Sequence, residues 1–445
     1  MRSINNIAEV YSLKMEEIPI DETWNFPCNK ENKMHSIHSY PAKFPAFITE
    51  KFINDYEARG FNADIVADVF CGCGTVSYET VRLGKHFWGC DINPVATLIA
   101  KVKSRTYDTE TLNYYFNEIL EQFKECKVDR NDEVYYNDRI NYWFDVEHID
   151  DLLKLRTSIK SIVDDFKYQD FFLCGFSNIL KPCSRWLTKS IKPQVDPFKD
   201  PSDVIIAFST QIKKMLKANM ENMVKTDGLA CIKQMNFLDF NDTLNVDLVI
   251  TSPPYVTSYE YADLHQLSTL WLGYSDDYKT FRQGSIGSRY HHCDYSDNYQ
   301  LINDVGKRVI SNLYGKSHSQ ARAVSQYYLD MQQVVSKIYS MLKERGECLF
   351  VIGDTEYKGV EMENARHLMA SLMDVGFKEV NICRRKISNK ILSPYRDASG
   401  KFTKCTTNSR KIYAEEYIIT VKKSIEILDC RDAFKMAEVC AYLLL

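Results

Sequence analysis

The sequence predicts an α/β fold built on a mostly parallel sheet, and three observations lead to that prediction. Short apolar runs, such as residues 65–70 and 246–250, have the composition of strands that are buried on both faces. Stretches of helical character lie between such runs, as expected where parallel strands are joined by crossover connections. Both runs end in turns rich in glycine or proline, and open α/β sheets bind ligands at the carboxyl ends of their strands.

The N-terminal half contains the first candidate site. The strand at 65–70 runs into Gly72 and Gly74 and then into a helix. Glycines permit close approach of the backbone to a ligand, and a helix N-terminus offers free N–H groups. A second strand at 87–90 ends in Asp91, which is well placed to accept hydrogen bonds from ribose hydroxyls. The pattern indicates a nucleotide site but lacks the third glycine of the dinucleotide fingerprint, which argues against nicotinamide or flavin.

Two segments fall outside the predicted core. Residues 107–227 form a mainly helical insertion, which is a candidate for target recognition or a simple lid. Residues 256–323 form a second insertion. The core is therefore predicted to comprise residues 1–106 and 228–424, and a C-terminal helix is predicted at 425–445.

The second candidate site is the turn that follows the strand at 246–250. Proline cannot continue the hydrogen-bond ladder of a strand, so the chain must leave the sheet at this point. The turn holds a hydroxyl group, proline-flanked carbonyls and an aromatic ring, which together suit a flat group with an exocyclic amine. Its residues, all predicted to be catalytic, are Thr251, Ser252, Pro253, Pro254 and Tyr255.

The C-terminal half supplies the remaining strands and a basic segment. Strands are predicted at 348–354, 378–383 and 412–421. Between the last two, residues 384–411 contain nine basic residues and one acid. Such a segment is a candidate clamp for DNA phosphates or, alternatively, a solvated loop.

Together these segments resemble motifs I, II and IV of the S-adenosylmethionine-dependent DNA amino-methyltransferases. Thr-Ser-Pro-Pro-Tyr is the form typical of the N4-cytosine enzymes of bacterial restriction-modification systems. The resemblance implies a Rossmann-like methyltransferase fold with seven strands, the last antiparallel, and a largely helical insertion. It also implies S-adenosyl-L-methionine as the cofactor and methylation of a cytosine flipped out of double-stranded DNA.

Two further segments resemble motifs of the same family: residues 38–45 resemble motif X, and residues 231–239 are placed like motif III. In the second of these, at 231–239, Met235 and Asn236 stand where the family has a Gly-Asp pair that binds adenine. An asparagine oxygen can still accept a hydrogen bond from an amine, and Asp239 is a nearby alternative. By resemblance, the cofactor contacts are Tyr40, Phe44, Phe70, Gly72, Gly74, Thr75, Asp91, Ile92, Asn236 and Phe237. The basic residues that we expect to contact DNA are Arg185, Lys189, Arg289, Arg384, Arg385, Lys386, Arg396, Lys401 and Lys404.

Three alternative functions use parts of the same pattern. Adenine N6-methylation has the same chemistry, but its enzymes usually have an acid where Ser252 stands. Methylation of an RNA base uses similar turns, yet we find no RNA-binding appendage. A DNA-binding module without activity would have a decayed cofactor site, whereas Gly72, Gly74 and Asp91 are all present.

Composition and charge limit the classes of protein to which this chain can belong. The net charge is −4, and no apolar run reaches the roughly 18 residues that suggest a membrane span. Fourteen cysteines without an export signal suggest reduced thiols and a cytoplasmic location, and without Cys-x-x-Cys pairs we expect no metal site. No nuclease motif is evident, so a cognate restriction endonuclease would be encoded separately.

Overall fold

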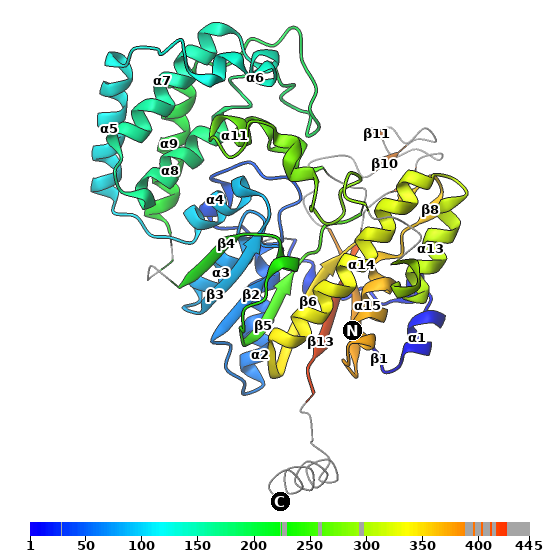
Figure 1. The fold of residues 1–445 in the computed structure, drawn as a ribbon. Coiled ribbons are helices and arrows are strands. Elements are labelled where there is room, and N and C mark those ends of the chain that lie inside the picture. Colours follow the sequence, from blue (N-terminus) through cyan, green and yellow to red (C-terminus); the bar gives the residue numbers. More distant parts are fainter. Residues whose placement is uncertain are drawn as a thin grey trace, which may run out of the picture.

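The computed structural model describes residues 1–27, 29–222, 224, 229–256, 260–292, 298–387, 395–396, 402–403, 410–411 and 415–424. An eight-stranded sheet forms the centre of the fold (Figure 1). Its strands, in spatial order, are β1 (Arg2–Ile4), β9 (Val380–Lys386), β13 (Glu415–Lys422), β6 (Leu342–Ile352), β5 (Val246–Thr251), β2 (Ile65–Asp68), β3 (His86–Asp91) and β4 (Ala230–Gln234).

The predicted mostly parallel sheet with an antiparallel last strand is confirmed. Strands β4, β3, β2, β5 and β6 run parallel, and β13 pairs antiparallel with both β6 and β9. The sheet has one strand more than predicted, because β1 adds antiparallel to the edge strand β9. The N-terminal residues are too charged and mixed to signal a strand, and only pairing with β9 makes them one.

Helices cover both faces of the sheet, which explains why the central strands are almost continuously apolar. On β5, Leu248 and Ile250 pack on one face with α2 (Ala46–Ala58), α3 (Thr75–Arg82) and α4 (Pro94–Lys103). Val249 points to the other face and packs with the group that contains α14 (His318–Met341) and α15 (Asn364–Asp374). The short helix α1 (Ile7–Ser12) and α13 (Asp304–Tyr314) lie on this second side.

The first insertion forms a helical body beside the sheet, at the upper left of Figure 1. Its helices are α5 (Thr109–Glu125), α6 (Asp138–Trp143), α7 (Val146–Ile162), α8 (Phe166–Ile179) and α9 (Val204–Met220). The second insertion begins with α10 (Tyr261–Leu264) and α11 (Gln266–Trp271).

These two short helices pack into the helical body. Trp271 is fully buried, with its ring 5.7 Å from that of Phe144 and 6.0 Å from that of Phe176. Gln266 accepts hydrogen bonds from Trp143 Nε1 at 3.0 Å and Arg139 Nε at 2.6 Å. The start of the second insertion therefore belongs to the same structural unit as the first, whereas α13 belongs with the core.

The smaller elements lie at the edges of this framework. Strands β7 (Glu356–Tyr357) and β8 (Val360–Glu361) form a hairpin. Strands β10 (Tyr395–Arg396), β11 (Phe402–Thr403) and β12 (Arg410–Lys411) form a separate three-stranded sheet. The predicted C-terminal helix at 425–445 lies outside the described residues. Within the described part of the chain, no helix has the length and apolar character needed to cross a membrane.

Candidate active site

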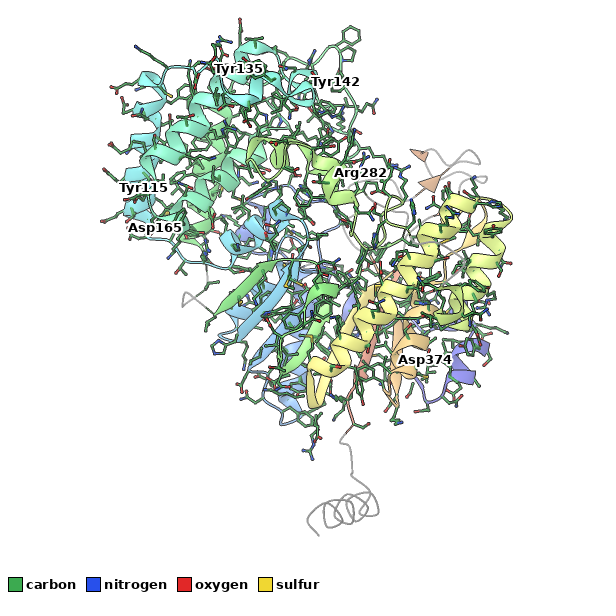
Figure 2. All side chains as sticks on the ribbon, in the orientation of Figure 1. Tyr115, Tyr135, Tyr142, Asp165, Arg282 and Asp374 are labelled. Atoms are coloured by element: carbon green, nitrogen blue, oxygen red, sulfur yellow. The ribbon has the colours of Figure 1, made fainter. Side chains whose placement is uncertain are left out.

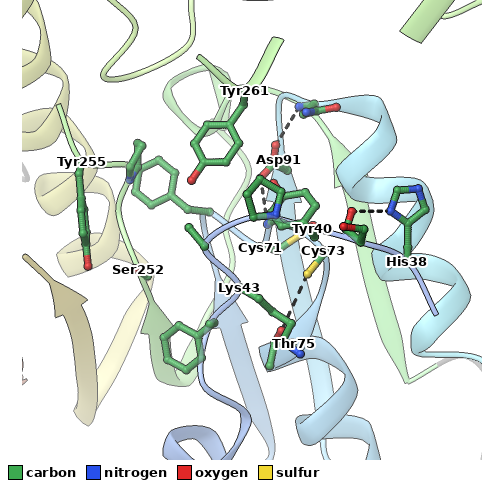
Figure 3. Close-up of a pocket in the computed structure, with 18 of the residues that line it drawn as sticks. His38, Tyr40, Lys43, Cys71, Cys73, Thr75, Asp91, Ser252, Tyr255 and Tyr261 are labelled. Carbon is green, nitrogen blue, oxygen red and sulfur yellow. Dashed lines mark hydrogen bonds between the residues drawn. The ribbon is translucent and has the colours of Figure 1, made fainter. Parts of the chain in front are cut away.

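A cleft of about 1760 Å³ runs along the carboxyl ends of β2, β3, β5 and β6. Its walls include residues of the glycine turn after β2, the end of β3 and the turn after β5, so the two predicted sites share one cavity. Figure 3 shows Ser252 and Tyr255 on one side of the cleft and Asp91 with Tyr40 on the other. Residues from both insertions complete the walls at 187–194 and 281–286.

The glycine turn after β2 has a backbone shape that only glycine adopts easily. Gly72 and Gly74 have φ angles of +47° and +73°. A Cβ atom on Gly74 would lie 2.5 Å from Cβ of Ala100, which is well inside contact distance. The turn therefore packs closely on α4. Toward the cleft it exposes backbone without side chains and the N-terminus of α3.

Asp91, at the tip of β3, is held by backbone donors on both oxygens. Oδ2 accepts from the Gly72 N–H at 2.9 Å, and Oδ1 accepts from the Asn93 N–H at 2.8 Å. Burial raises the pKa of Asp91 to about 6, and these two N–H groups oppose that rise by stabilising the carboxylate. Each oxygen keeps a further lone pair, so the side chain can also accept from ribose hydroxyls.

The segment 38–45 covers the glycine turn from the N-terminal side. The ring of Tyr40 lies over Gly72 and stacks on His265, with ring centroids 5.1 Å apart. His38 anchors the segment to α8, since its Nε2 lies 2.9 Å from Ser177 Oγ. Burial lowers the pKa of His38 to about 4, so it is neutral at physiological pH. Phe44 and Thr75 also line the cleft.

Asn236 lies at the other end of the cofactor region. Its Oδ1 accepts from the Leu238 N–H at 3.0 Å, and its Nδ2 donates to the Gly284 carbonyl at 3.2 Å. These two bonds orient the amide and leave one lone pair of Oδ1 for an amine. Ile92 lies beside Gly284, and Phe237 lines the cleft but is only 2% exposed, because it packs on Phe240 and Trp88.

The second insertion thus contributes to the end of the cleft where we expect the cofactor, which the sequence does not reveal. Arg282 holds the 281–286 loop by donating from Nε to Asp263 of α10 at 2.8 Å, and Figure 2 shows it beside the helical body. The Gly284 N–H donates to His291 Nδ1 at 3.1 Å. No local pattern links these residues to Asn236, which is 48 positions away from Gly284.

Thr251 differs from the catalytic role that we expected. It is fully buried, and its Oγ1 donates to Asp68 Oδ1 at 2.6 Å, behind the cleft surface. The same Asp68 oxygen accepts from the Phe70 N–H at 3.0 Å. Asp68, which sequence reasoning missed, therefore ties the glycine turn after β2 to the turn after β5, and Thr251 does not line the cleft. Burial raises the pKa of Asp68 to about 7.

Ser252 and Tyr255 face the cleft. Ser252 Oγ donates its proton to the Val351 carbonyl of β6 at 2.8 Å and also forms a side-chain hydrogen bond with Tyr255, so one lone pair of Oγ remains as an acceptor. Tyr255 packs close to Gly353, where a Cβ atom would lie 3.1 Å from its ring. Burial raises the pKa of Tyr255 well above its ordinary value, so the phenol stays neutral. Pro253 and Pro254 also line the cleft.

Comparison with known proteins agrees with this geometry. Residues 4–102 match the family N6_N4_Mtase, described as DNA methylase. The chain is 24% identical to the Type II methyltransferase M.MvaI of Kocuria varians over 414 residues, which cover 84% of this chain and 88% of that protein. It is 21% identical to M.AvaI of Nostoc sp. over 401 residues (79% of this chain and 81% of that protein). This chain is a DNA amino-methyltransferase.

A third relative matches a smaller part of the methyltransferase. M.MjaII of Methanocaldococcus jannaschii is 28% identical over 213 residues, which cover 47% of this chain and 39% of that protein. Among solved structures, the rRNA methyltransferase aviRa from Streptomyces viridochromogenes has a TM-score of 0.24 at 10% identity, over 76% of this chain and 92% of that chain.

The methyl donor of the methyltransferase is S-adenosylmethionine, and the residues present fit it. The αL glycines provide a backbone surface without side chains, and Asp91 has free lone pairs at the tip of β3. Among the residues that the structure describes, no cluster of His, Cys, Asp or Glu is arranged to hold a metal ion.

The basic residues expected to contact DNA fall into three groups. Lys189, Arg289 and Lys386 are exposed, and Lys189 lines the cleft. The side chains of Arg396, Lys401 and Lys404 lie outside the described part of the chain.

The third group is held by closer partners within the protein, whereas Arg289 and Lys386 of the exposed group form longer ion pairs, with Glu260 and Glu22, each at 3.5 Å. Arg185 donates to the carbonyls of Asn141 and Tyr142 at 2.9 and 2.8 Å, which ties its loop to α6. Arg384 donates to the Ile18 carbonyl at 2.7 Å and pairs with Glu415 at 3.0 Å, so it holds the N-terminal segment. Arg385 is only 2% exposed. The structure therefore gives these three arginines roles other than the surface phosphate contact that we expected.

Proposed function

We propose that this methyltransferase transfers a methyl group from S-adenosylmethionine to the N4 amine of a cytosine that is flipped out of double-stranded DNA at a specific site. The observation that supports this proposal is the hydrogen bond that the Ser252 hydroxyl donates to the Val351 carbonyl. The proton is committed to this carbonyl, so the serine oxygen presents a neutral acceptor to the cleft. The resemblance to N4-cytosine enzymes rests on a serine at this position of the turn.

The turn acts on the target amine through acceptors. Ser252 Oγ and the Pro253 carbonyl accept the two N–H groups of the amine, which draws the nitrogen lone pair out of conjugation with the ring. Tyr255 stacks on the ring, an interaction worth about 1–3 kcal/mol per base. Flipping the base out of the duplex costs a few kcal/mol, so stacking offsets much of that cost.

Little further chemistry is required of the protein. The cofactor, when bound, supplies a methyl group on a sulfonium, which is already a good leaving group. The chain's residues then have to hold the amine in line with the methyl carbon and to keep the ring from moving. The Asp68–Thr251 hydrogen bond serves this purpose, because it joins the backbone that carries the cofactor turn to the backbone that carries Ser252. The amine proton leaves to water after transfer.

The exposed cations near the cleft suit contact with the DNA backbone. We assign phosphate contacts to Lys189, Arg289 and Lys386, which are exposed on three different segments. Affinity for DNA would then fall steeply with salt concentration, because each contact releases counterions. A separately encoded restriction endonuclease with the same recognition sequence would be the partner of such an enzyme.

Nucleoside analysis tests the proposal directly. The full chain, and the Ser252→Ala variant as control, are expressed in a bacterial host that lacks DNA methyltransferases. Mass spectrometry of digested DNA and RNA is expected to show N4-methylcytosine in DNA from the wild type only. N6-methyladenine, a methylated RNA base or no modification would each overturn the proposal. Single-molecule sequencing of the same DNA then reports the recognition sequence.

A further inference from the structure

A buried ion pair lies at the catalytic end of the cleft. Arg385 Nη1 donates to Glu416 Oε1 at 2.6 Å, and the exposed fractions of the two side chains are 3% and 12%. Both residues line the same cleft as Ser252 and Tyr255. Glu416 is near enough to Tyr255 to add to the rise in its pKa that burial causes. A charged pair is costly to bury, so its place in the wall of a substrate cleft calls for an explanation.

The sheet register places this pair at the same edge of the sheet as the catalytic turn. Arg385 is the direct neighbour of Glu416 across β9 and β13, and Tyr417 is the neighbour of Ile352 across β13 and β6. Strand β6 in turn pairs with β5, which ends at Thr251. Three strand spacings, about 14 Å, therefore separate the backbone of Arg385 from that of the catalytic turn. A pyrimidine ring and the arginine side chain fit within that span.

Arg385 has donors to spare. A guanidinium group carries five N–H donors. Its Nε is buried and has no hydrogen-bond partner among the residues that the structure describes. A buried donor without an acceptor costs free energy, so a ligand that supplies the acceptor gains from filling the site. The wall of the cleft at β9 and β13 therefore offers a cation that is aligned by Glu416 and able to donate.

We propose that Arg385 selects cytosine as the target base by donating to N3 and O2 of the flipped ring, with Glu416 as its positioning residue. Cytosine carries these two acceptors beside its amine. Adenine has a single acceptor, N1, next to its amine, followed by a C–H group. The inference rests on the proposed function, since it requires a base held with its amine at Ser252.

The neighbouring pair Arg384–Glu415 provides a matched control. It joins the same two strands one residue earlier and contacts the Ile18 carbonyl, on the face that does not line the cleft. The test compares the double variants R385M/E416Q and R384M/E415Q, each of which removes both charges of one pair and leaves no buried charge unpaired. Circular dichroism and cofactor affinity establish that each variant is folded.

The measurement is kcat/KM on a duplex with the recognition sequence, carrying either cytosine or 3-deazacytosine at the target position. The analogue keeps the amine but has a C–H group in place of N3. We expect the wild type and R384M/E415Q to lose about 10- to 100-fold on the analogue, as for a base contact by arginine. For R385M/E416Q we expect a low kcat/KM on cytosine. Changing cytosine to the analogue should lower its kcat/KM by less than about threefold further, because the variant no longer has the arginine donor that N3 would accept from.

The outcomes separate the inference from the proposed function. If R385M/E416Q discriminates against the analogue as strongly as the wild type does, Arg385 does not read the base and only joins β9 to β13. If R384M/E415Q loses discrimination equally, the effect comes from the sheet and not from Arg385. If the wild-type product is N6-methyladenine, the proposed function itself fails, whatever the variants do.

Discussion

Replacing Thr251 by valine removes one hydroxyl group with almost no change in side-chain volume. In the wild type that hydroxyl donates to Asp68 at 2.6 Å, and the two residues are 0% and 2% exposed. In the variant, Asp68 Oδ1 keeps only the Phe70 N–H. Leaving a buried acceptor without its donor costs about 1–3 kcal/mol, more for a charged group. We therefore expect the free energy of unfolding to fall by about 2 kcal/mol at pH 8.

The loss is expected to depend on pH. The hydrogen bond from Thr251 lowers the pKa of Asp68, which burial raises to about 7, so the variant pKa lies higher still. Above pH 7 the variant must hold a carboxylate that has lost its donor, whereas at pH 5.5 the group is neutral in both proteins. The difference in stability is thus larger at pH 8 than at pH 5.5.

Urea unfolding at both pH values, together with a methylation assay, measures these effects. Thr251→Ser is the control, since it keeps the hydroxyl and is expected to remain close to wild type in activity. Thr251→Val is expected to reduce methylation more than cofactor affinity, because the bond holds the catalytic turn. If Thr251→Val changes the unfolding free energy by less than about 0.5 kcal/mol at pH 8, the hydrogen bond does not hold the two turns together.

Three further predictions concern the same cleft. Asp68→Asn keeps an oxygen acceptor but does not titrate. Between about pH 4 and its pKa near 7, wild-type Asp68 is protonated in the folded state but ionised in the unfolded state, so the wild type loses stability as the pH rises. The unfolding free energy of the variant minus that of the wild type should therefore increase across this pH range in urea titrations. A difference that does not change with pH would contradict this. Gly74→Ala is expected to weaken cofactor binding at least tenfold in calorimetry, whereas Gly84→Ala, with φ +74° and open space around it, should bind normally. Tyr255→Ala should abolish methylation while cofactor affinity stays within about twofold of wild type, and full activity on duplex DNA would exclude the stacking role.

Local composition and turn chemistry predicted the central strands of the sheet, and the family resemblance supplied the antiparallel last strand. Strands buried on both faces are recognisable from local composition, as at β2 and β5. The glycine turn could also be predicted, because Gly72 and Gly74 stand where the backbone needs positive φ. The short strand β1 could not, since its pairing with β9 joins residues about 380 positions apart and leaves no local pattern.

The charged residues show where local patterns reach their limit. In the sequence, the adjacent Arg384 and Arg385 at the end of β9 look like one basic patch. Successive side chains of a strand point to opposite faces of the sheet, so Arg384 contacts the N-terminal segment and Arg385 lines the cleft. Asp68 sits two residues before Phe70 with no motif of its own, and only its contact with Thr251 reveals its role.

Local sequence, then, determined the central strands of the sheet and the two turns that line the cleft, because burial period and the backbone limits of glycine and proline act over a few residues. Tertiary structure alone decided which side chains meet across the cleft. The closure of the cofactor end by Gly284 and the ion pair of Arg385 with Glu416 depend on how strands and insertions that are distant in the chain are placed side by side.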